Sequence, residues 1–150
     1  MKLRNYQPED CSQLATLFYE TVHHINAKDY TTAQLNAWAT GQVNLDEWHR
    51  SFLTHDTIVA TTNGIIVGFG DMDETGTLDR LFVHKDYQHQ GIATAICNAL
   101  EGRSKQKRIS THTSLTAQVF FARRGYRVVQ ELSVQRNGIT LTTILMEKML

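Results

Sequence analysis

The sequence predicts an α/β fold in which a mixed β-sheet carries helices on its faces. Three observations support this fold class. Apolar residues recur at helical spacing near the N-terminus, and Asn-Gly pairs separate β-rich runs at Asn63-Gly64 and Asn137-Gly138. Residues 77–114 have a strand–helix–strand pattern, and a right-handed crossover would make its two strands near neighbours and roughly parallel. Hairpins flank this unit, so we expect a mixed sheet rather than a fully parallel one.

Three helices are predicted before the first hairpin. The first covers about residues 9–26, where the apolar side chains share one helical face. The second begins at an N-cap, Thr31 or Thr32, and closes at Gly41, a residue suited to a left-handed helix end. The third covers residues 44–53. The predicted N-terminal region is therefore mostly helical after one short opening strand.

The remaining elements are predicted from turn residues and from changes of period. In chain order they are a hairpin over 57–73, a turn over 73–76, a strand over 77–84, a helix after Gly91, a short strand over 108–114, a helix over 115–124 that Gly125 stops, and a final hairpin over 126–148. We expect the whole chain, residues 1–150, to form one domain, because a chain of this length buries roughly 70% of its unfolded surface.

The charge balance argues against a general polyanion binder. The chain has 15 Lys and Arg residues against 15 Asp and Glu residues, and its pI is about 7.1. Proteins that bind nucleic acid carry basic faces and a higher pI. The one basic cluster, residues 103–108, is typical of a solvated helix end. We therefore expect no nucleic-acid partner.

The cysteines and the hydropathy indicate the compartment. Cys11 and Cys97 lie in predicted helices without metal-ligand spacing, so we expect neither a disulfide framework nor a metal site. No run approaches the ~18 apolar residues of a membrane span, and residues 1–10 lack an apolar leader core. These features predict no membrane association and a cytoplasmic location.

The stretch QHQGIA, Gln88 to Ala93, joins an apolar strand to an amphipathic helix. The first N–H groups of a helix have no partner within it, and the helix dipole adds positive charge there. Gly91 removes a Cβ where an anion would approach. The stretch matches neither a GxGxxG nor a GxxxxGK[ST] pattern. By itself it indicates either a pyrophosphate site or an ordinary strand-to-helix turn.

These residues resemble the GNAT superfamily of N-acetyltransferases, whose acetyl-CoA loop is Q/R-x-x-G-x-G/A. Gln88, Gly91 and Ala93 occupy its three defined positions, LFVHKDYQHQGIATAI is similar along its whole length, and FFARRGYR follows at the matching distance. The resemblance covers nearly the whole chain. It implies the GNAT fold: a mixed, mostly antiparallel sheet with helices on both faces and a central parallel strand pair at the CoA cleft.

The resemblance implies acetyl-CoA as co-substrate and no metal. Backbone groups of Leu81 and Val83 would pair with the pantetheine arm, and N–H groups of the loop would hold the pyrophosphate. The residues implied for CoA binding are Leu81, Phe82, Val83, Gln88, His89, Gln90, Gly91, Ile92, Ala93, Thr94, Ser114, Ala117 and Phe120.

The implied reaction is transfer of the acetyl group to a primary amine of a small molecule, by direct attack in a ternary complex. Such a reaction needs a neutral amine, a polarised thioester and a proton for the thiolate. Asp79 is the favoured base and His112 the second candidate; an ion pair between Asp79 and Arg80 is the structural alternative.

The sequence leaves several groups open as the acid that protonates the thiolate. Many members of the family use a tyrosine where this chain has Phe121, which has no proton to give. Tyr126, Tyr87 or a water would replace it, or the thiolate would leave unprotonated, since a free thiol has a pKa near ~8.5.

By resemblance, Tyr19, His23, Tyr30 and Trp38 would contact the acceptor, with Trp48 nearby. A protein or peptide acetyltransferase and a non-catalytic acyl-CoA-binding module remain alternatives at this point. The resemblance also implies a homodimer through the final strands; the segment 139–148 is apolar enough to be either a buried strand or an exposed edge that pairs.

Overall fold

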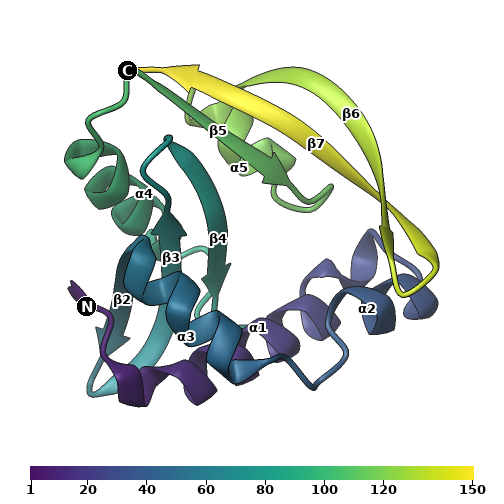
Figure 1. Ribbon diagram of the computed structural model, residues 1–150, viewed down its shortest axis with the longest axis horizontal. Coiled ribbons are helices and arrows are strands. Elements are labelled where there is room, and N and C mark those ends of the chain that lie inside the picture. Colours follow the sequence, from purple (N-terminus) through teal and green to yellow (C-terminus); the bar gives the residue numbers. More distant parts are fainter.

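A seven-stranded sheet organises the computed structural model, which describes residues 1–150 (Figure 1). The strands are β1 (Lys2–Asn5), β2 (Asp56–Thr62), β3 (Ile65–Met72), β4 (Thr77–Val83), β5 (Arg108–Thr113), β6 (Arg127–Arg136) and β7 (Ile139–Met149). The helices are α1 (Cys11–His24), α2 (Thr32–Trp38), α3 (Leu45–Thr54), α4 (Ile92–Arg103) and α5 (Gln118–Arg123), with short 3-10 turns at Pro8–Asp10 and Asn26–Lys28. No helix has the length and apolar character that crossing a membrane requires.

The sheet order is β1-β2-β3-β4-β5-β7-β6, and every neighbouring pair except β4 and β5 is antiparallel. The predicted parallel pair and the predicted mixed sheet are therefore confirmed. Both hairpin turns are also confirmed: the Asn and the Gly of each pair have positive φ angles, which a type I′ turn requires at its two central positions.

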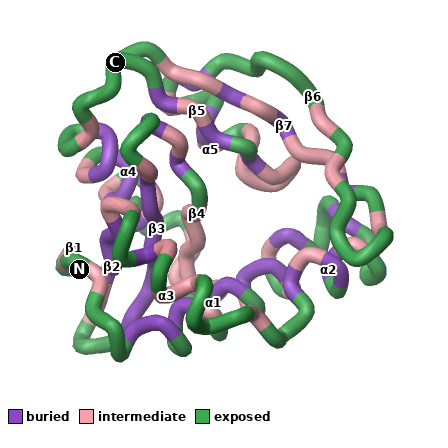
Figure 2. The backbone as a smooth tube through the Cα atoms, viewed as in Figure 1, coloured by how far each residue is buried: buried purple, intermediate pink, exposed green.

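Helices cover both faces of the sheet, and each face has its own hydrophobic core (Figures 1 and 2). Strand β2 shows how the alternation of side chains separates the cores: Ile58 and Ala60 join the core under α4, whereas Val59 joins the core with α1, α2 and α3. Strands β2 and β3 are buried on both faces, which explains their nearly continuous apolar sequences.

Two glycines let helix α4 approach the sheet closely. A Cβ at Gly68 would lie 2.9 Å from Ile92 Cγ2, and a Cβ at Gly70 would lie 2.9 Å from Ile96 Cγ2. Both separations are shorter than an ordinary carbon–carbon contact. The glycines of β3 thus set the height of α4 above the sheet, and with it the position of the loop that precedes α4.

Strands β4 and β5 separate soon after they meet. Their parallel pairing is limited to Thr77 with Ser110 and Leu78 with Thr111, after which β5 follows β7 and β4 stays with β3 (Figure 1). The C-terminal half of β4 consequently has no strand on its β5 side. This divergence opens the sheet at its centre.

Helix α2 differs from the prediction at its C-terminal end. The helix ends at Trp38 rather than at Gly41, because Ala39 is already extended with φ −123°. Side chains satisfy the carbonyl oxygens there: Asn137 Nδ2 donates to Ala37 O, and His23 Nε2 lies 2.8 Å from Ala39 O. Long-range contacts therefore replace the local glycine cap, although Gly41 does have a positive φ in the following loop.

Candidate active site

The loop between β4 and α4 is shaped to receive an anion. Gly91 is the N-cap of α4 with φ +78°, and His89 also has a positive φ, +59°. A non-glycine residue in this region is uncommon and costs energy. Left-handed residues next to a helix start turn successive N–H groups toward one point, which forms an anion-binding concavity. No atom lies within 4 Å of the position that a Cβ of Gly91 would take, so the space there is open.

Gln88 fixes this loop to the end of β4. Its Nε2 donates to the carbonyl oxygens of Val83, at 2.7 Å, and His84, at 3.3 Å. The side-chain amide is therefore already used within the protein. In this structure Gln88 shapes the loop, and the backbone N–H groups supply the donors for an anion.

A cavity of about 310 Å³ extends from this loop along the free part of β4. It brings together twelve of the thirteen residues predicted for CoA binding: Leu81, Phe82, Val83, Gln88, His89, Gly91, Ile92, Ala93, Thr94, Ser114, Ala117 and Phe120. Gln90, the thirteenth, is exposed and does not line the cavity. We call this space the loop cavity.

The backbone of β4 is free to pair with a ligand in the loop cavity. His84 N–H donates to Val67 O on β3 at 2.8 Å. Backbone groups of successive strand residues point to alternate sides, so those of Leu81 and Val83 face away from β3. The carbonyl of Val83 accepts there from Thr21 Oγ1 and from Gln88. The N–H groups of Leu81 and Val83 face the space that β5 leaves open.

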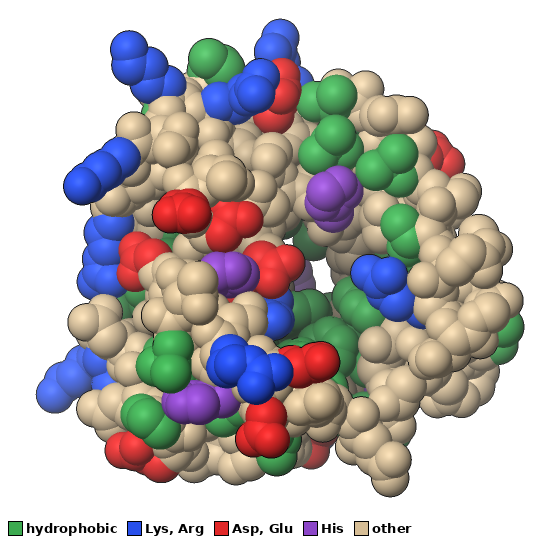
Figure 3. Space-filling model, in the orientation of Figure 1, with side chains coloured by type: hydrophobic (Ala, Val, Ile, Leu, Met, Phe, Trp, Pro, Cys, Tyr) green, Lys and Arg blue, Asp and Glu red, His purple; other side chains and the backbone are tan.

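A second, larger cavity of about 620 Å³ lies on the other side of the gap between β4 and β5, and we call it the aromatic cavity. Leu81, Phe82, Ser114 and Ala117 line both cavities. The two spaces therefore meet at the middle of β4 and at the start of the segment after β5. Figure 3 shows the molecule hollowed at this place, with hydrophobic side chains in its depth.

Asp79 and His112, the two predicted bases, both line the aromatic cavity. Asp79 lies on β4 two residues before Leu81, and its side chain is 46% exposed. Its carboxylate lies 3.7 Å from Arg80 Nη1, so the ion pair considered as an alternative is present but long. His112 lies on β5, next to Thr111, the last residue of β5 that pairs with β4.

Tyr126 is not in a position to act as the acid. It is buried in the core under α4, and its hydroxyl donates to Glu101 Oε2 at 2.7 Å. Burial and the neighbouring carboxylate raise the pKa of Tyr126 well above its usual value. It lines neither cavity, whereas Phe121 lines the aromatic cavity. The sequence did not indicate that the Tyr126 side chain points into the core, because its direction depends on a contact with a distant helix.

Two of the four residues predicted for the acceptor line the aromatic cavity, namely Tyr30 and Trp38. Tyr19 and His23 do not; their ring centroids lie 4.2 Å apart with the planes tilted by 35°, and His23 Nε2 lies 2.8 Å from Ala39 O. The lining residues that sequence reasoning missed are Phe18, Val43, Arg80, Thr111, Thr113, Leu132, Val134, Arg136, Leu141 and Thr143. Strict alternation along β6 places Leu132, Val134 and Arg136 on one face, and this pattern could have indicated part of the set.

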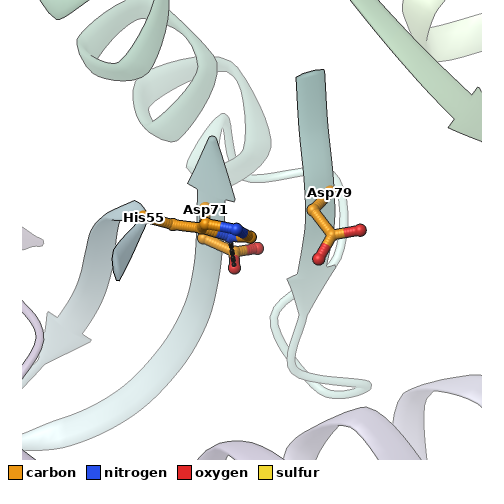
Figure 4. A group of neighbouring side chains, drawn as sticks. All are labelled: His55, Asp71 and Asp79. Carbon is orange, nitrogen blue, oxygen red and sulfur yellow. Dashed lines mark hydrogen bonds and ion pairs between the residues drawn. The ribbon is translucent and has the colours of Figure 1, made fainter. Parts of the chain in front are cut away.

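A cluster of charged side chains lies behind Asp79. Asp71 on β3 is fully buried, and its Oδ2 accepts from His55 Nδ1 at 2.8 Å (Figure 4) and also from Arg80 Nη1. One nitrogen of His55 and one carboxylate oxygen each of Asp71 and Asp79 lie within 4.8 Å of one another. The guanidinium of Arg80 already supplies the positive charge in this cluster. We therefore interpret it as an ion-pair network that supports β4.

His55 links the stability of this cluster to pH. The hydrogen bond that His55 donates to Asp71 raises the pKa of His55 above its ordinary value, against the lowering effect of burial and of Arg80, and the charges of Asp71 and Asp79 also raise it. A raised folded-state pKa contributes stability that is present below the unfolded pKa, about 6.5, and is lost as the pH rises through the folded value.

We expect His55→Gln to lower the free energy of unfolding more at about pH 6 than at about pH 9, because only the wild type gains from the protonated imidazole. Urea unfolding at both pH values measures this difference. His24→Gln, on an exposed part of α1, is the matched control and should show no such dependence. An equal loss at both pH values in His55→Gln would contradict the linkage.

Comparisons with known proteins agree with this site. Residues 26–150 match the family model of the acetyltransferase (GNAT) domain. The chain is 31% identical over 146 residues to the uncharacterized N-acetyltransferase YafP of Escherichia coli K12, covering 97% of this chain and 94% of YafP. It superimposes on a GCN5-related N-acetyltransferase of Rhodopseudomonas palustris with a TM-score of 0.95 and 32% identity, covering 99% and 95% of the two chains. With the PaiA N-acetyltransferase of Thermoplasma acidophilum, solved with coenzyme A, the TM-score is 0.81 at 16% identity, covering 99% and 98%.

These comparisons identify an acyltransferase, and the open centre of the sheet and the loop at Gly91 agree with an acyl-CoA donor. The chain belongs to the GNAT family of acetyltransferases. Acetyl-CoA fits as its co-substrate, and the GNAT fold expected from the sequence is confirmed.

Proposed function

We propose that the protein transfers the acetyl group of acetyl-CoA to a primary amine of a small molecule by direct attack. The observation that carries this proposal is the meeting of the two cavities at Leu81, Phe82, Ser114 and Ala117. CoA in the loop cavity would bring its thioester to this junction. An acceptor in the aromatic cavity would meet it from the opposite side.

The loop cavity suits the CoA moiety for two reasons. The N–H groups around Gly91 and the dipole of α4 favour a pyrophosphate, and the free N–H groups on β4 suit an extended pantetheine arm, which would bind as an added strand. The N–H of Val83 would then polarise the thioester carbonyl.

Direct attack is favoured over a covalent acyl-enzyme. Both cysteines are buried and line neither cavity, and burial raises the pKa of Cys97 to about 12. A thiol with so high a pKa is a poor nucleophile at neutral pH. The acceptor amine itself would therefore attack the thioester in a complex that holds both substrates.

Asp79 is our proposed base, and His112 is the second candidate. Asp79 lies on the same strand as the carbonyl-polarising N–H of Val83, and its carboxylate faces the aromatic cavity. There it would accept a proton from the acceptor ammonium directly or through one water. The amine would then be neutral when it meets the thioester.

The thiolate would leave without the tyrosine that many members of the family use. Phe121 stands at that position, and Tyr126 is committed to Glu101. Tyr87 lines the loop cavity and is the remaining tyrosine on the CoA side. Because a thiol with a pKa near ~8.5 is a tolerable leaving group at neutral pH, protonation by Tyr87 or by water would suffice.

Thiol release from acetyl-CoA tests the proposal against a panel of amino acids, simple amines, polyamines, aminoglycosides and basic peptides. We expect turnover with small amines and little with peptides, since only one carboxylate, Asp79, lines the acceptor side. Initial rates should give intersecting double-reciprocal lines; parallel lines would indicate a covalent intermediate. Turnover of a peptide above every small amine would overturn the small-molecule assignment.

A further inference from the structure

The aromatic cavity has an uneven distribution of charge. It is lined by one carboxylate, Asp79, and by two guanidinium groups, Arg80 and Arg136. The remaining lining is mainly apolar, with an aromatic wall formed by Phe18, Trp38 and Trp48. A pocket of about 620 Å³ in which apolar and aromatic side chains are combined with polar groups is typical of a small-molecule site, where the polar groups orient the ligand.

The guanidinium of Arg80 already has partners within the protein. It donates to the buried Asp71 and, at 3.2 Å, to Ser51 Oγ. Its guanidinium also lies 4.7 Å from the ring centres of Trp48 and Phe52. These partners fix the side chain and neutralise its charge. Arg80 therefore forms part of the cavity wall.

Arg136 is different, because its guanidinium has no carboxylate partner. Its one hydrogen bond is from Nη1 to the carbonyl oxygen of Gln135, at 3.4 Å, and it forms no ion pair. The position of the residue is nevertheless fixed. The next residue, Asn137, donates from Nδ2 to Ala37 O on α2 at 3.1 Å, which holds the hairpin tip beside Trp38.

The wall that leads to Arg136 is apolar. Leu132 and Val134 precede it on the same face of β6, and Leu141 lines the cavity from β7. Arg136 thus lies at the outer end of an apolar surface, while Asp79 and the junction with the loop cavity lie at its inner end on β4. Figure 3 shows Lys or Arg side chains on both sides of the hollow.

From this arrangement we propose that the acceptor is an amine that carries a carboxylate at the other end of an apolar spacer, as ω-amino acids do, and that Arg136 binds this carboxylate. The inference rests on the proposed function. The amine would be oriented toward Asp79, the apolar spacer would pack on the aromatic wall, and the carboxylate would pair with the free guanidinium. A guanidinium offers the planar pair of donors that a carboxylate prefers.

The same charges disfavour polycationic acceptors. Polyamines, aminoglycosides and basic peptides would bring several positive charges to a cavity that offers one carboxylate, Asp79, and one guanidinium without a carboxylate partner, Arg136. Like charges that are partly desolvated repel each other strongly. A zwitterionic acceptor instead meets a charge of opposite sign at each end.

The test compares matched acceptors in the thiol-release assay. 6-Aminohexanoate and 4-(aminomethyl)benzoate are compared with pentylamine and benzylamine, the corresponding amines without the carboxylate. We expect kcat/KM to favour the amino acids by about tenfold or more, because an unpaired site arginine penalises an analogue that lacks its partner. Arg136→Gln should raise the KM of the amino acids about tenfold, at nearly unchanged kcat, and leave the KM of the simple amines within about twofold.

Arg123→Gln is the matched control, because Arg123 is exposed on α5, forms no ion pair and lines neither cavity. The affinity for CoA, measured by calorimetry, should be unchanged in both variants, which separates a local effect from misfolding. Two results would overturn the inference and leave the proposed function standing. One is a wild-type kcat/KM for the simple amines that equals or exceeds that for the amino acids. The other is an equal loss of kcat/KM on both acceptor types in Arg136→Gln. Absence of thiol release with every amine would overturn both.

Discussion

Gly91→Glu is expected to abolish tight binding of CoA. The substitution places a side chain at φ +78°, a conformation that costs an L residue roughly 1–2 kcal/mol. It also puts a carboxylate at the start of α4, where the pyrophosphate is proposed to bind. We expect the dissociation constant of CoA to rise about 100-fold or more, which corresponds to about 2.7 kcal/mol. Calorimetric titration with CoA measures it.

Gly64→Glu provides a closely matched control. Gly64 has φ +77° and, like Gly91, no atom within 4 Å of an added Cβ, but it lies at the tip of the β2–β3 hairpin and lines neither cavity. The Gly64→Glu variant should lose a similar amount of stability and bind CoA normally. Normal CoA binding by Gly91→Glu would show that the loop does not hold the pyrophosphate.

Asp79→Asn is expected to stop turnover while leaving CoA binding intact. Removal of a general base lowers the rate by about 100- to 10,000-fold, and asparagine has nearly the same shape as aspartate. Asp79 lines only the aromatic cavity, so the affinity for CoA should not change. Thiol release with the best acceptor, measured beside calorimetry with CoA, checks both expectations.

Asp46→Asn, on the exposed side of α3, controls for the loss of one negative charge and should turn over normally. If Asp79→Asn kept a rate within a few-fold of the wild type, Asp79 would be the ion-pair partner of Arg80 rather than the base. His112→Gln would then be the variant expected to lose turnover, since His112 is the other titratable group proposed for this step.

The features that depend mainly on neighbouring residues could be predicted from the sequence. The two Asn-Gly turns, the parallel strand pair and the loop at Gly91 each follow from a short stretch whose conformation its own residues decide. Most of the residues that the resemblance implies for CoA binding line one cavity, because they belong to one continuous strand–loop–helix segment. Only Gln90 fell outside the loop cavity.

The residues that line the aromatic cavity could be identified only from the tertiary structure. The aromatic cavity is assembled from helices near the N-terminus, the middle strands and the final hairpin, so no local pattern could specify it. Tyr126 points inward because its hydroxyl group bonds to Glu101 on helix α4. Helix α2 ends before Gly41 because Asn137 and His23 bond to the carbonyl oxygens at its end. Arg136 became a candidate for substrate binding only when the structure showed that its guanidinium, unlike that of Arg80, has no carboxylate partner. Local backbone preferences act over a few residues, whereas burial and charge pairing depend on the whole fold.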